Sequence, residues 1–456
     1  MRRIRLTIHP LLFPILFFGL TILIGAVLLH SDYSRGTSAI SWIDALFTAT
    51  SATCVTGLAV VDTGTVYSRF GQTVILVLIQ VGGLGIMTLT SLAMYLLRQR
   101  VSLTDRIAVG QNLLHDPSFH LGRFLISIVL LTLGIEALGA VLLPLASGGG
   151  MDSYLAVFHA VSAFCNAGFS LYPDSLMRWQ SSLPVNLVFI ALIVLGGIGF
   201  SVLVETGTWL GARTRQAVTH TRRPVRLTWY TRVVLQTTLF LIVFGWLLVY
   251  VADYALYERS LPTATALLVS LFQSVTSRTA GFNTVGIEHM TNVSLLVIIF
   301  LMLIGAAPGS CGGGIKVTTF RVMVAFFVAQ IRGREQVVVG SIATSRETLN
   351  RALVLTLFSV SIICVAVLLL SVTEGGEVPH IQSRGQLLEI VFEVVSAFAT
   401  TGLSTGLTPT LSLPGKCIII ALMFIGRLGP LLFIAVLQNI QRRESYFRPE
   451  GDLLIG

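Results

Sequence analysis

Four short segments of the sequence place a glycine at the same point of a shared pattern. Each has a phenylalanine, a hydroxyl residue four positions later and a glycine nine or ten positions after the phenylalanine. Because glycine has no Cβ, it can take a positive φ and turn a carbonyl oxygen toward an ion while leaving room for it. Rings of backbone carbonyls replace the hydration shell of a potassium ion, so the pattern predicts a potassium-selective filter. The glycines are Gly57, Gly168, Gly281 and Gly402.

The predicted filter takes four residues from each turn. None of them is a carboxylate, which disfavours calcium-type selection by rings of Asp or Glu. Glu393 lies too early, on the helix expected before the fourth turn. The alternative is that the glycines only end helices at C′ positions, although capping does not require the same turn in every copy. The filter residues are Val55, Thr56, Gly57 and Leu58, Asn166, Ala167, Gly168 and Phe169, Thr279, Ala280, Gly281 and Phe282, and Thr400, Thr401, Gly402 and Leu403.

The composition excludes an ordinary soluble protein. The 456 residues are 54% hydrophobic and 11% charged, whereas about a quarter of an average soluble domain is charged. The first apolar run lacks a small-residue cleavage site, so we expect a retained helix rather than a signal peptide. Runs suited to membrane spans lie near Leu11 to Leu29, Gly71 to Leu97, Phe124 to Leu145, Val185 to Leu210, Val233 to Val251, Val293 to Ile304, Ala352 to Val372 and Ile418 to Leu437.

Positive charge alternates between the loops. It collects at both termini and in the stretches Arg98 to Arg123, Arg213 to Arg232 and Lys316 to Arg351. The positive-inside rule therefore predicts a multi-pass protein of the plasma membrane with both termini in the cytoplasm. The same rule accounts for the net charge of +9 without a nucleic-acid partner. The loops expected outside hold only Arg35, Arg69, Arg178, Arg259, Arg278, Arg384 and Lys416.

The chain divides into four repeats, at 1–105, 106–220, 221–345 and 346–456. Each has a span, a polar segment, a glycine turn and a second span. Segments before the turns, such as Trp42 to Thr53 and Leu155 to Phe164, are too short to cross a bilayer and predict re-entrant helices. Irregular backbone at membrane depth must line a cavity or lie inside protein. We therefore expect an all-α polytopic membrane protein, with eight transmembrane helices and four pore helices in parallel repeats around a pseudo-fourfold pore.

A gate is expected below the filter. The second span of each repeat carries a cluster of small residues, and in the fourth repeat Arg427 interrupts the cluster. A charge at mid-span costs at least ~2.5 kcal/mol and normally faces a cavity or a partner. We expect Arg427 to project into the conduction path and oppose cations. The alternative, an arginine bonded to helix-end carbonyls for structure alone, is compatible with that role.

The cluster of the third repeat predicts an unwound intramembrane loop. The run from Gly305 to Lys316 contains Pro308 and too many glycines to remain helical. Such a loop suits a gate that moves out of the path. A phosphate-binding loop is the rival, but no strand precedes the run and no Lys-Ser/Thr pair closes it. The gate residues are Gly305, Gly309, Ser310, Gly312, Gly313, Gly314, Lys316 and Arg427.

The four single-glycine turns resemble those of the superfamily of potassium transporters that includes TrkH, KtrB, plant HKT proteins and KdpA. Because only about 10 residues precede the first span, the chain is most similar to KtrB. Serine in the first turn marks sodium-preferring HKT members, and this chain has Gly57 there, so the resemblance implies potassium. It also implies a movable loop in the third repeat and a transporter rather than an enzyme.

The resemblance implies partners as well. KtrB and TrkH sit on a cytoplasmic ring of nucleotide-binding subunits (KtrA or TrkA), for which the basic loops are the available docking surface, and KtrB proteins pair as homodimers. No nucleotide site is visible in this sequence, so control by nucleotides would come from the partner. No cofactor is expected, with potassium as the transported ion and sodium a candidate activator. The five cysteines lack metal-ligand or paired spacing.

Three alternatives stay open. One is a TrkH-type potassium transporter, and another is a sodium- or proton-coupled carrier, which would usually show inverted repeats and ionisable residues at the midplane. The third is a polytopic membrane enzyme, for which acidic or histidine clusters at a membrane edge are expected. The histidines are scattered, and Glu136 and Glu205 are isolated in the sequence.

Overall fold

The computed structural model describes residues 13–36, 39–85, 121–219, 226–255, 261–375, 379 and 385–429. These residues are mainly helical, apart from a small antiparallel hairpin of β1 (Val338–Val339) and β2 (Ile342–Ala343). The helices are α1 (Phe13–His30), η2 (Asp32–Ser34), α2 (Trp42–Thr53), α3 (Thr63–Val66), α4 (Arg69–Gly83), α7 (Leu121–Ala146), α8 (Ser153–Phe164), η3 (Met177–Trp179), α9 (Leu183–Gly197), α10 (Phe200–Thr219), α11 (Trp229–Tyr250), η4 (Val251–Ala255), α12 (Thr263–Thr276), η5 (Ile287–His289), α13 (Asn292–Leu303), α14 (Val317–Ile331), α15 (Arg346–Gly375), α16 (Gln386–Ala399), η6 (Thr408–Thr410) and α17 (Leu413–Leu428).

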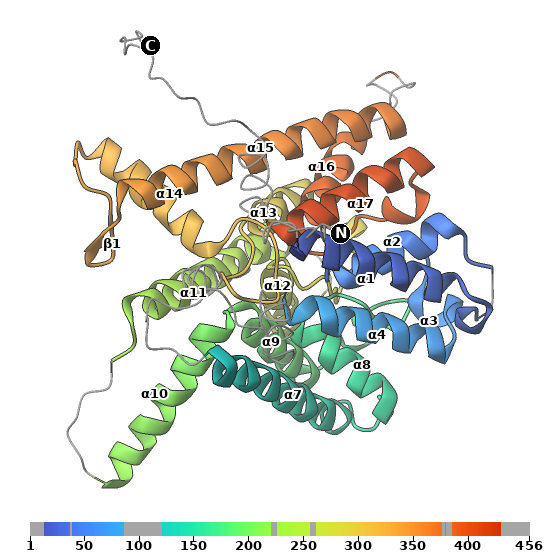
Figure 1. Cartoon of the computed structure of the whole chain (residues 1–456), viewed down its shortest axis with the longest axis horizontal. Helices are drawn as coiled ribbons and strands as arrows, with labels where there is room; N and C mark the ends of the chain where they lie inside the picture. Colours follow the sequence, from blue (N-terminus) through green and yellow to red (C-terminus); the bar gives the residue numbers. More distant parts are fainter. Residues whose placement is uncertain are drawn as a thin grey trace, which may run out of the picture.

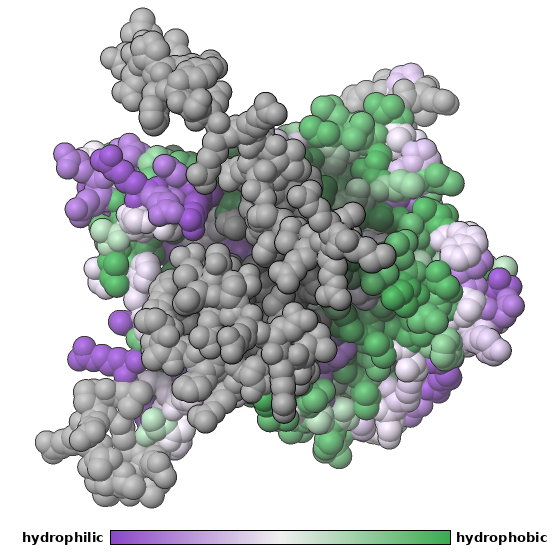
Figure 2. Space-filling view, viewed as in Figure 1, coloured by the Kyte–Doolittle hydropathy of each residue, from purple (hydrophilic) through white to green (hydrophobic). Residues whose placement is uncertain are grey.

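Apolar helices face outward over much of the surface, as lipid requires. Within the described ranges, three helical segments are long and apolar enough to cross a membrane: Ile126–Ala146, Trp229–Ala255 and Arg346–Gly375. Figure 2 shows a broad hydrophobic surface over α1, α4 and α17, bordered at the right edge by hydrophilic residues. The composition and the helices together make this an all-α polytopic membrane protein.

Each half-length helix packs on the longer helix that precedes it and on a neighbour from another part of the chain. Thus α2 packs on α1, α8 on α7, α12 on α11 and α16 on α15. The second set of contacts joins α4 to α8, α9 to α12, α13 to α16 and α17 to α2. In Figure 1 the last helices, α16 and α17, accordingly lie beside the first, α1 and α2.

The second helices end at their small-residue clusters, and here the sequence-based prediction was incomplete. We predicted an interruption in the third repeat alone, but α4, α9 and α17 also end there, with positive φ at Gly85, Gly199 and Gly429. The run from Val185 to Leu210 was expected to form one span. Instead, α9 and α10 meet at an angle of 111°.

Close packing explains why glycine is needed at these breaks. A Cβ built on Gly82, Gly196 or Gly426 would lie closer than 3.0 Å to a carbonyl oxygen near the end of the adjacent half-length helix. Those oxygens belong to Thr53, Phe164 and Phe398. Several predicted features lie outside the described residues, among them most of the basic stretch Arg98 to Arg123 and the charged termini.

Candidate functional site

The four pattern glycines lie against one another in a closed ring. A Cβ built on any of them would come within 2.8 Å of the carbonyl oxygen of the residue that precedes the next glycine. Starting from Gly57, these oxygens belong to Ala167, Ala280, Thr401 and Thr56, so the order returns to its starting point. All four glycines have positive φ, from +69° to +93°. A side chain would therefore meet both a steric and a conformational barrier at each of them.

The four turns also share a backbone conformation at the position two residues before each glycine. Val55, Asn166, Thr279 and Thr400 all have φ between +51° and +72°. A left-handed conformation is unusual for non-glycine residues, above all for β-branched ones, and costs of order 1–3 kcal/mol where the surrounding structure imposes it. Four copies of one strained turn, brought together from across the chain, are typical of a functional site.

The hydroxyl residue of each pattern stabilises its turn through a hydrogen bond to the turn's backbone. Ser51 Oγ accepts a hydrogen bond from the Gly57 N–H, and Ser396 Oγ accepts one from the Gly402 N–H, both at 3.1 Å. In the other two turns the hydroxyl donates to the carbonyl oxygen of the residue after the glycine. These bonds join Ser162 to Phe169 at 2.8 Å and Thr276 to Phe282 at 2.6 Å.

An open cavity of about 410 Å³ lies on one side of the glycine ring. All four glycines contribute to its lining, together with the acidic residues Asp62 and Glu288. On the same side, the Asp62 carboxylate accepts hydrogen bonds from the Gly64 N–H and the Thr65 hydroxyl. A cavity lined by carboxylates favours cations over anions by ordinary electrostatics.

The other side of the ring receives the C-terminal ends of the half-length helices. Helices α2, α8, α12 and α16 all end just before a turn, and a helix C-terminus carries partial negative charge. Within the described part of the chain, four buried threonine hydroxyls of the turns have no hydrogen-bond partner. They belong to Thr56, Thr279, Thr400 and Thr401. Neutral oxygens and helix C-termini around a small space suit a dehydrated monovalent cation.

The glycine-rich loop between α13 and α14 is not helical, as predicted, and it lies directly against the turns. A Cβ on Gly312 would collide with the Thr279 hydroxyl, and one on Gly313 with the Thr400 hydroxyl. The loop also folds back on itself, since a Cβ on Gly305 would meet the Gly313 carbonyl oxygen. The loop thus covers the third and fourth turns on the side away from the acidic cavity.

Three cationic side chains hold carbonyl groups of this loop. Arg427 donates to the carbonyl oxygens of Cys311 and Gly82, and its position in the conduction path stays a prediction. Lys316 Nζ donates to the Gly312 oxygen at 2.7 Å and to the Gly313 oxygen at 3.3 Å. The loop is therefore tied to α17 and α4 through Arg427.

The third cation, Arg278, was assigned wrongly from the sequence. We counted it among charges of the outer loops, but it is 6% exposed, beside the third turn. Its guanidinium donates to the carbonyl oxygens of Gly305 at 3.4 Å and Thr238 at 3.3 Å. The count failed because it assumed that every residue between two spans lies in water, whereas this segment enters the protein interior.

Two further buried polar residues support the second turn, and sequence reasoning gave them no role. His159 lies within hydrogen-bonding distance of the Leu155 carbonyl oxygen through Nδ1 and of the Ser170 hydroxyl through Nε2. Glu136, from α7, accepts hydrogen bonds from Gln80 and from the thiol of Cys165. Their signal in the sequence was an ionisable residue within an apolar run, which usually marks function.

Comparison with known proteins identifies the family of this chain. The family model described as "Cation transport protein", TrkH, matches residues 17–446. The Ktr system potassium uptake protein B of Bacillus subtilis is 40% identical over 96% of this chain and 95% of its own length. The potassium/sodium uptake protein NtpJ of Enterococcus hirae is 34% identical over 100% of this chain and 99% of its own length.

A solved structure shares the fold. The potassium transporter TrkH from Vibrio parahaemolyticus superimposes with a TM-score of 0.71, covering 96% of this chain and 86% of that one at 20% identity. The match of the family model over nearly the whole chain and the level of identity to its relatives decide the family. This chain belongs to the TrkH family of cation transport proteins and is a transporter of the KtrB type.

Proposed function

We propose that this chain carries potassium ions into the cell through a single-chain, pseudo-fourfold pore made of four repeats. The observation that supports this most directly is the closed ring of Gly57, Gly168, Gly281 and Gly402, each against the carbonyl oxygen of its neighbour. The sixteen residues of the four turns would form the selectivity filter. Their carbonyl oxygens, together with the unpartnered threonine hydroxyls, would replace the water that the ion loses.

The charges support one orientation of the chain in the membrane. The acidic cavity beside the ring would be the outer vestibule, in which Asp62 and Glu288 raise the local concentration of cations. The basic segments would face the cytoplasm, with both termini, which places the glycine-rich loop on the inner side of the filter. Labelling of Tyr33→Cys, an 83% exposed position, by a membrane-impermeant maleimide in intact cells tests this orientation, and protection of that site would reverse it.

The glycine-rich loop would act as the gate. It lies against the third and fourth turns, and its carbonyl groups are held by Arg278, Lys316 and Arg427. Three positive charges beneath a cation filter oppose the exit of potassium. Opening would therefore require both the loop and Arg427 to leave the path, while Gly305, Gly309 and the triple glycine 312–314 supply the backbone freedom for that movement.

A regulatory partner and a second copy of the chain complete the proposal. Relatives at 40% and 34% identity are named as components of a Ktr system, which supports a membrane subunit that works with other subunits. We expect a cytoplasmic ring of nucleotide-binding subunits and a homodimer of this chain.

Ion flux in liposomes tests the function. The purified protein should take up rubidium, which substitutes for potassium, and potassium should compete for that uptake much better than sodium. Equal competition by both ions would indicate transport of sodium as well as potassium. The Enterococcus relative is named a potassium/sodium uptake protein. Uptake that depends on a sodium gradient would indicate a coupled carrier, and the absence of uptake would contradict the proposal.

A further inference from the structure

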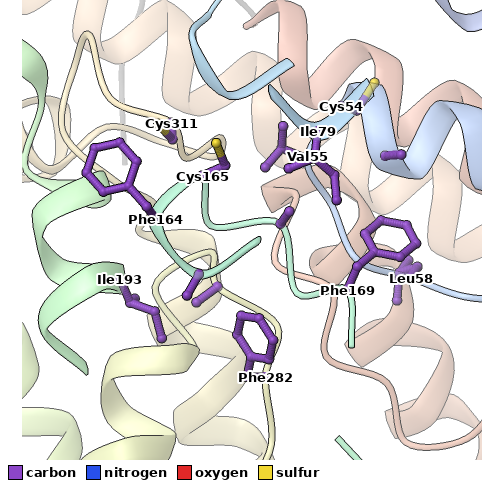
Figure 3. Packing of buried hydrophobic residues seen from close by; sticks show 14 of the residues in the cluster. Cys54, Val55, Leu58, Ile79, Phe164, Cys165, Phe169, Ile193, Phe282 and Cys311 are labelled. Carbon is purple, nitrogen blue, oxygen red and sulfur yellow. The ribbon is translucent and has the colours of Figure 1, made fainter. Parts of the chain in front are cut away.

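Two buried thiols face each other between the filter and the loop. Cys165 follows the last residue of α8, at the inner end of the second turn, and Cys311 lies in the middle of the glycine-rich loop. The two residues are 0% and 1% exposed, and their thiols lie near enough to interact. Figure 3 shows the two residues next to each other, Cys165 on the turn and Cys311 on the loop.

The backbone around Cys311 fixes its position. Its N–H donates to the Gly196 carbonyl oxygen at 3.2 Å, and its own carbonyl oxygen accepts a hydrogen bond from Arg427. These two hydrogen bonds hold the backbone of Cys311 next to α9 and α17. Two cysteines can form a disulfide without movement of the backbone only where their side chains already lie close together, and Figure 3 shows Cys165 and Cys311 side by side.

A carboxyl group lies behind the pair. Cys165 Sγ is 3.6 Å from Glu136 Oε1, and the other oxygen of Glu136 accepts a hydrogen bond from Gln80 Nε2 at 3.1 Å. A thiol must lose its proton before it reacts, because the thiolate is the nucleophile. Glu136 already accepts the hydrogen bond of the Cys165 thiol and can therefore receive its proton.

We propose that Cys165 and Cys311 form a modification site for hydrogen peroxide or related small peroxides. In the first step the Cys165 thiolate attacks a peroxide oxygen, the O–O bond breaks, and sulfenic acid and hydroxide form. In the second step the Cys311 thiol attacks the sulfenic sulfur, a disulfide forms, and water leaves. The hydroxide takes the proton that Glu136 received from Cys165, so together the steps oxidise two thiols and reduce one peroxide to two waters.

The burial of the pair makes the reaction depend on the state of the loop. Buried thiols are inert while the loop covers them. When the loop moves, Cys165 is exposed to solvent that enters from the inner side, and its return brings Cys311 back to the oxidised sulfur. The disulfide would then fasten the loop to the second turn and stop flux. The effect on flux, though not the chemistry, rests on the gate proposed above.

The chain provides its own control for unrelated oxidation. Cys364 on α15 and Cys417 on α17 are exposed cysteines far from the pair in sequence. The starting protein is therefore the double variant Cys364→Ser/Cys417→Ser, which should take up rubidium as the natural chain does. This protein is treated with hydrogen peroxide in liposomes, and rubidium uptake is measured before treatment, after it, and after dithiothreitol.

The expected result is loss of uptake with peroxide, recovery with dithiothreitol, and a disulfide-linked peptide pair containing Cys165 and Cys311 in the mass spectrum. The further variants Cys311→Ser and Cys165→Ser should give no linked peptides and keep their uptake. Failure of the parent to form linked peptides, or equal inhibition in both serine variants, would overturn the inference. Linked peptides with unchanged uptake would contradict the proposal that the disulfide stops flux by holding the loop to the second turn. The proposed transport itself is tested separately, by the uptake before treatment.

Discussion

Gly57 and Gly402 touch although 345 positions separate them in the sequence. A Cβ on Gly402 would lie 3.0 Å from the Gly57 Cα and closer still to the Thr56 carbonyl oxygen. This contact joins the first turn to the last and closes the ring that the other two glycines continue. Whatever the ring binds, its geometry depends on the absence of side chains at these positions.

Substitution of Gly402 by serine should weaken discrimination between potassium and sodium. The residue has φ of +88° and no room for a Cβ, so the turn must shift and its carbonyl oxygens lose their spacing. We expect the ratio of potassium to sodium flux to fall about tenfold, equivalent to about 1.4 kcal/mol. Flux in liposomes with each ion in turn measures the ratio.

Gly134→Ala is the matched control for this substitution. Gly134 lies within the helix α7, and a Cβ added there would meet nothing within 4 Å. The new methyl group therefore disturbs no neighbour, and selectivity should not change. If Gly402→Ser also left the selectivity unchanged, the assignment of the filter would be wrong.

Loss of the Ser396 hydroxyl should affect the fourth turn without adding bulk. Ser396 Oγ accepts a hydrogen bond from the Gly402 N–H at 3.1 Å, and Ser396 is completely buried. Ser396→Ala leaves that N–H without its partner, which costs about 1–3 kcal/mol. We expect a lower thermal midpoint and reduced selectivity, while Ser396→Thr, which keeps a hydroxyl, should restore part of both. Ser361→Ala on the exposed face of α15 serves as control, and equal effects at both serines would argue against a role for this bond.

Removal of the Arg427 guanidinium should raise basal flux. Its two hydrogen bonds hold the Cys311 carbonyl group of the loop and the Gly82 carbonyl group of α4. Hydrogen bonds from charged groups contribute about 1.5–3 kcal/mol each, so Arg427→Gln should increase the open population, and rubidium uptake, by about tenfold or more. Rubidium uptake by Arg427→Lys should lie between that of the natural chain and that of Arg427→Gln, since an ammonium group keeps the charge but not the planar fork.

Shortening of the loop between Gly309 and Gly314 should act in the same direction, because a shorter loop covers less of the turns. Arg351→Gln, which breaks an exposed ion pair with Glu347 on α15, should leave uptake as it is. If neither Arg427→Gln nor the shortened loop changed basal uptake, the gate would have to be sought elsewhere.

The four turns could be predicted because local chemistry determines them. The glycine, the hydroxyl residue and the preceding half-length helix lie within about a dozen positions, and the predicted helix Trp42 to Thr53 coincides with α2. The unwound loop of the third repeat was predictable for the same reason, since Pro308 and its neighbouring glycines exclude a helix by themselves.

The remaining features depend on tertiary contacts that no local pattern encodes. The glycines of α4, α9 and α17 lie within apolar stretches of sequence, which predict a continuous helix. The helices end where these glycines pack against the ends of the half-length helices. The burial of Arg278 was missed because every charge between two spans was assigned to a loop in water, whereas this segment enters the protein interior. The approach of Cys165 to Cys311 joins the turn after α8 to the loop between α13 and α14, and neither residue has metal-ligand or paired spacing in the sequence.

The ion pair between Asp44 and Lys416 should stabilise the contact between α2 and α17. Lys416 Nζ, on α17, lies 2.7 Å from Asp44 Oδ1, on α2, and the two side chains are 16% and 18% exposed. Asp44 also accepts a hydrogen bond from the Ser41 hydroxyl at 2.6 Å and lies at the favourable N-terminus of α2. Because Asp44 keeps these two interactions, Lys416→Met should cost only about 1 kcal/mol.

A double-mutant cycle with Asp44→Asn and Lys416→Met, followed by thermal unfolding, isolates the pair from those other contacts. The exposed pair of Asp32 and Arg35 provides the comparison, because the Asp32 side chain is 86% exposed and solvent screens the attraction. Arg35→Met should therefore leave the thermal midpoint nearly unchanged. A coupling near zero for Asp44 and Lys416 would mean that the packing of α17 on α2 holds the two helices together without help from charge.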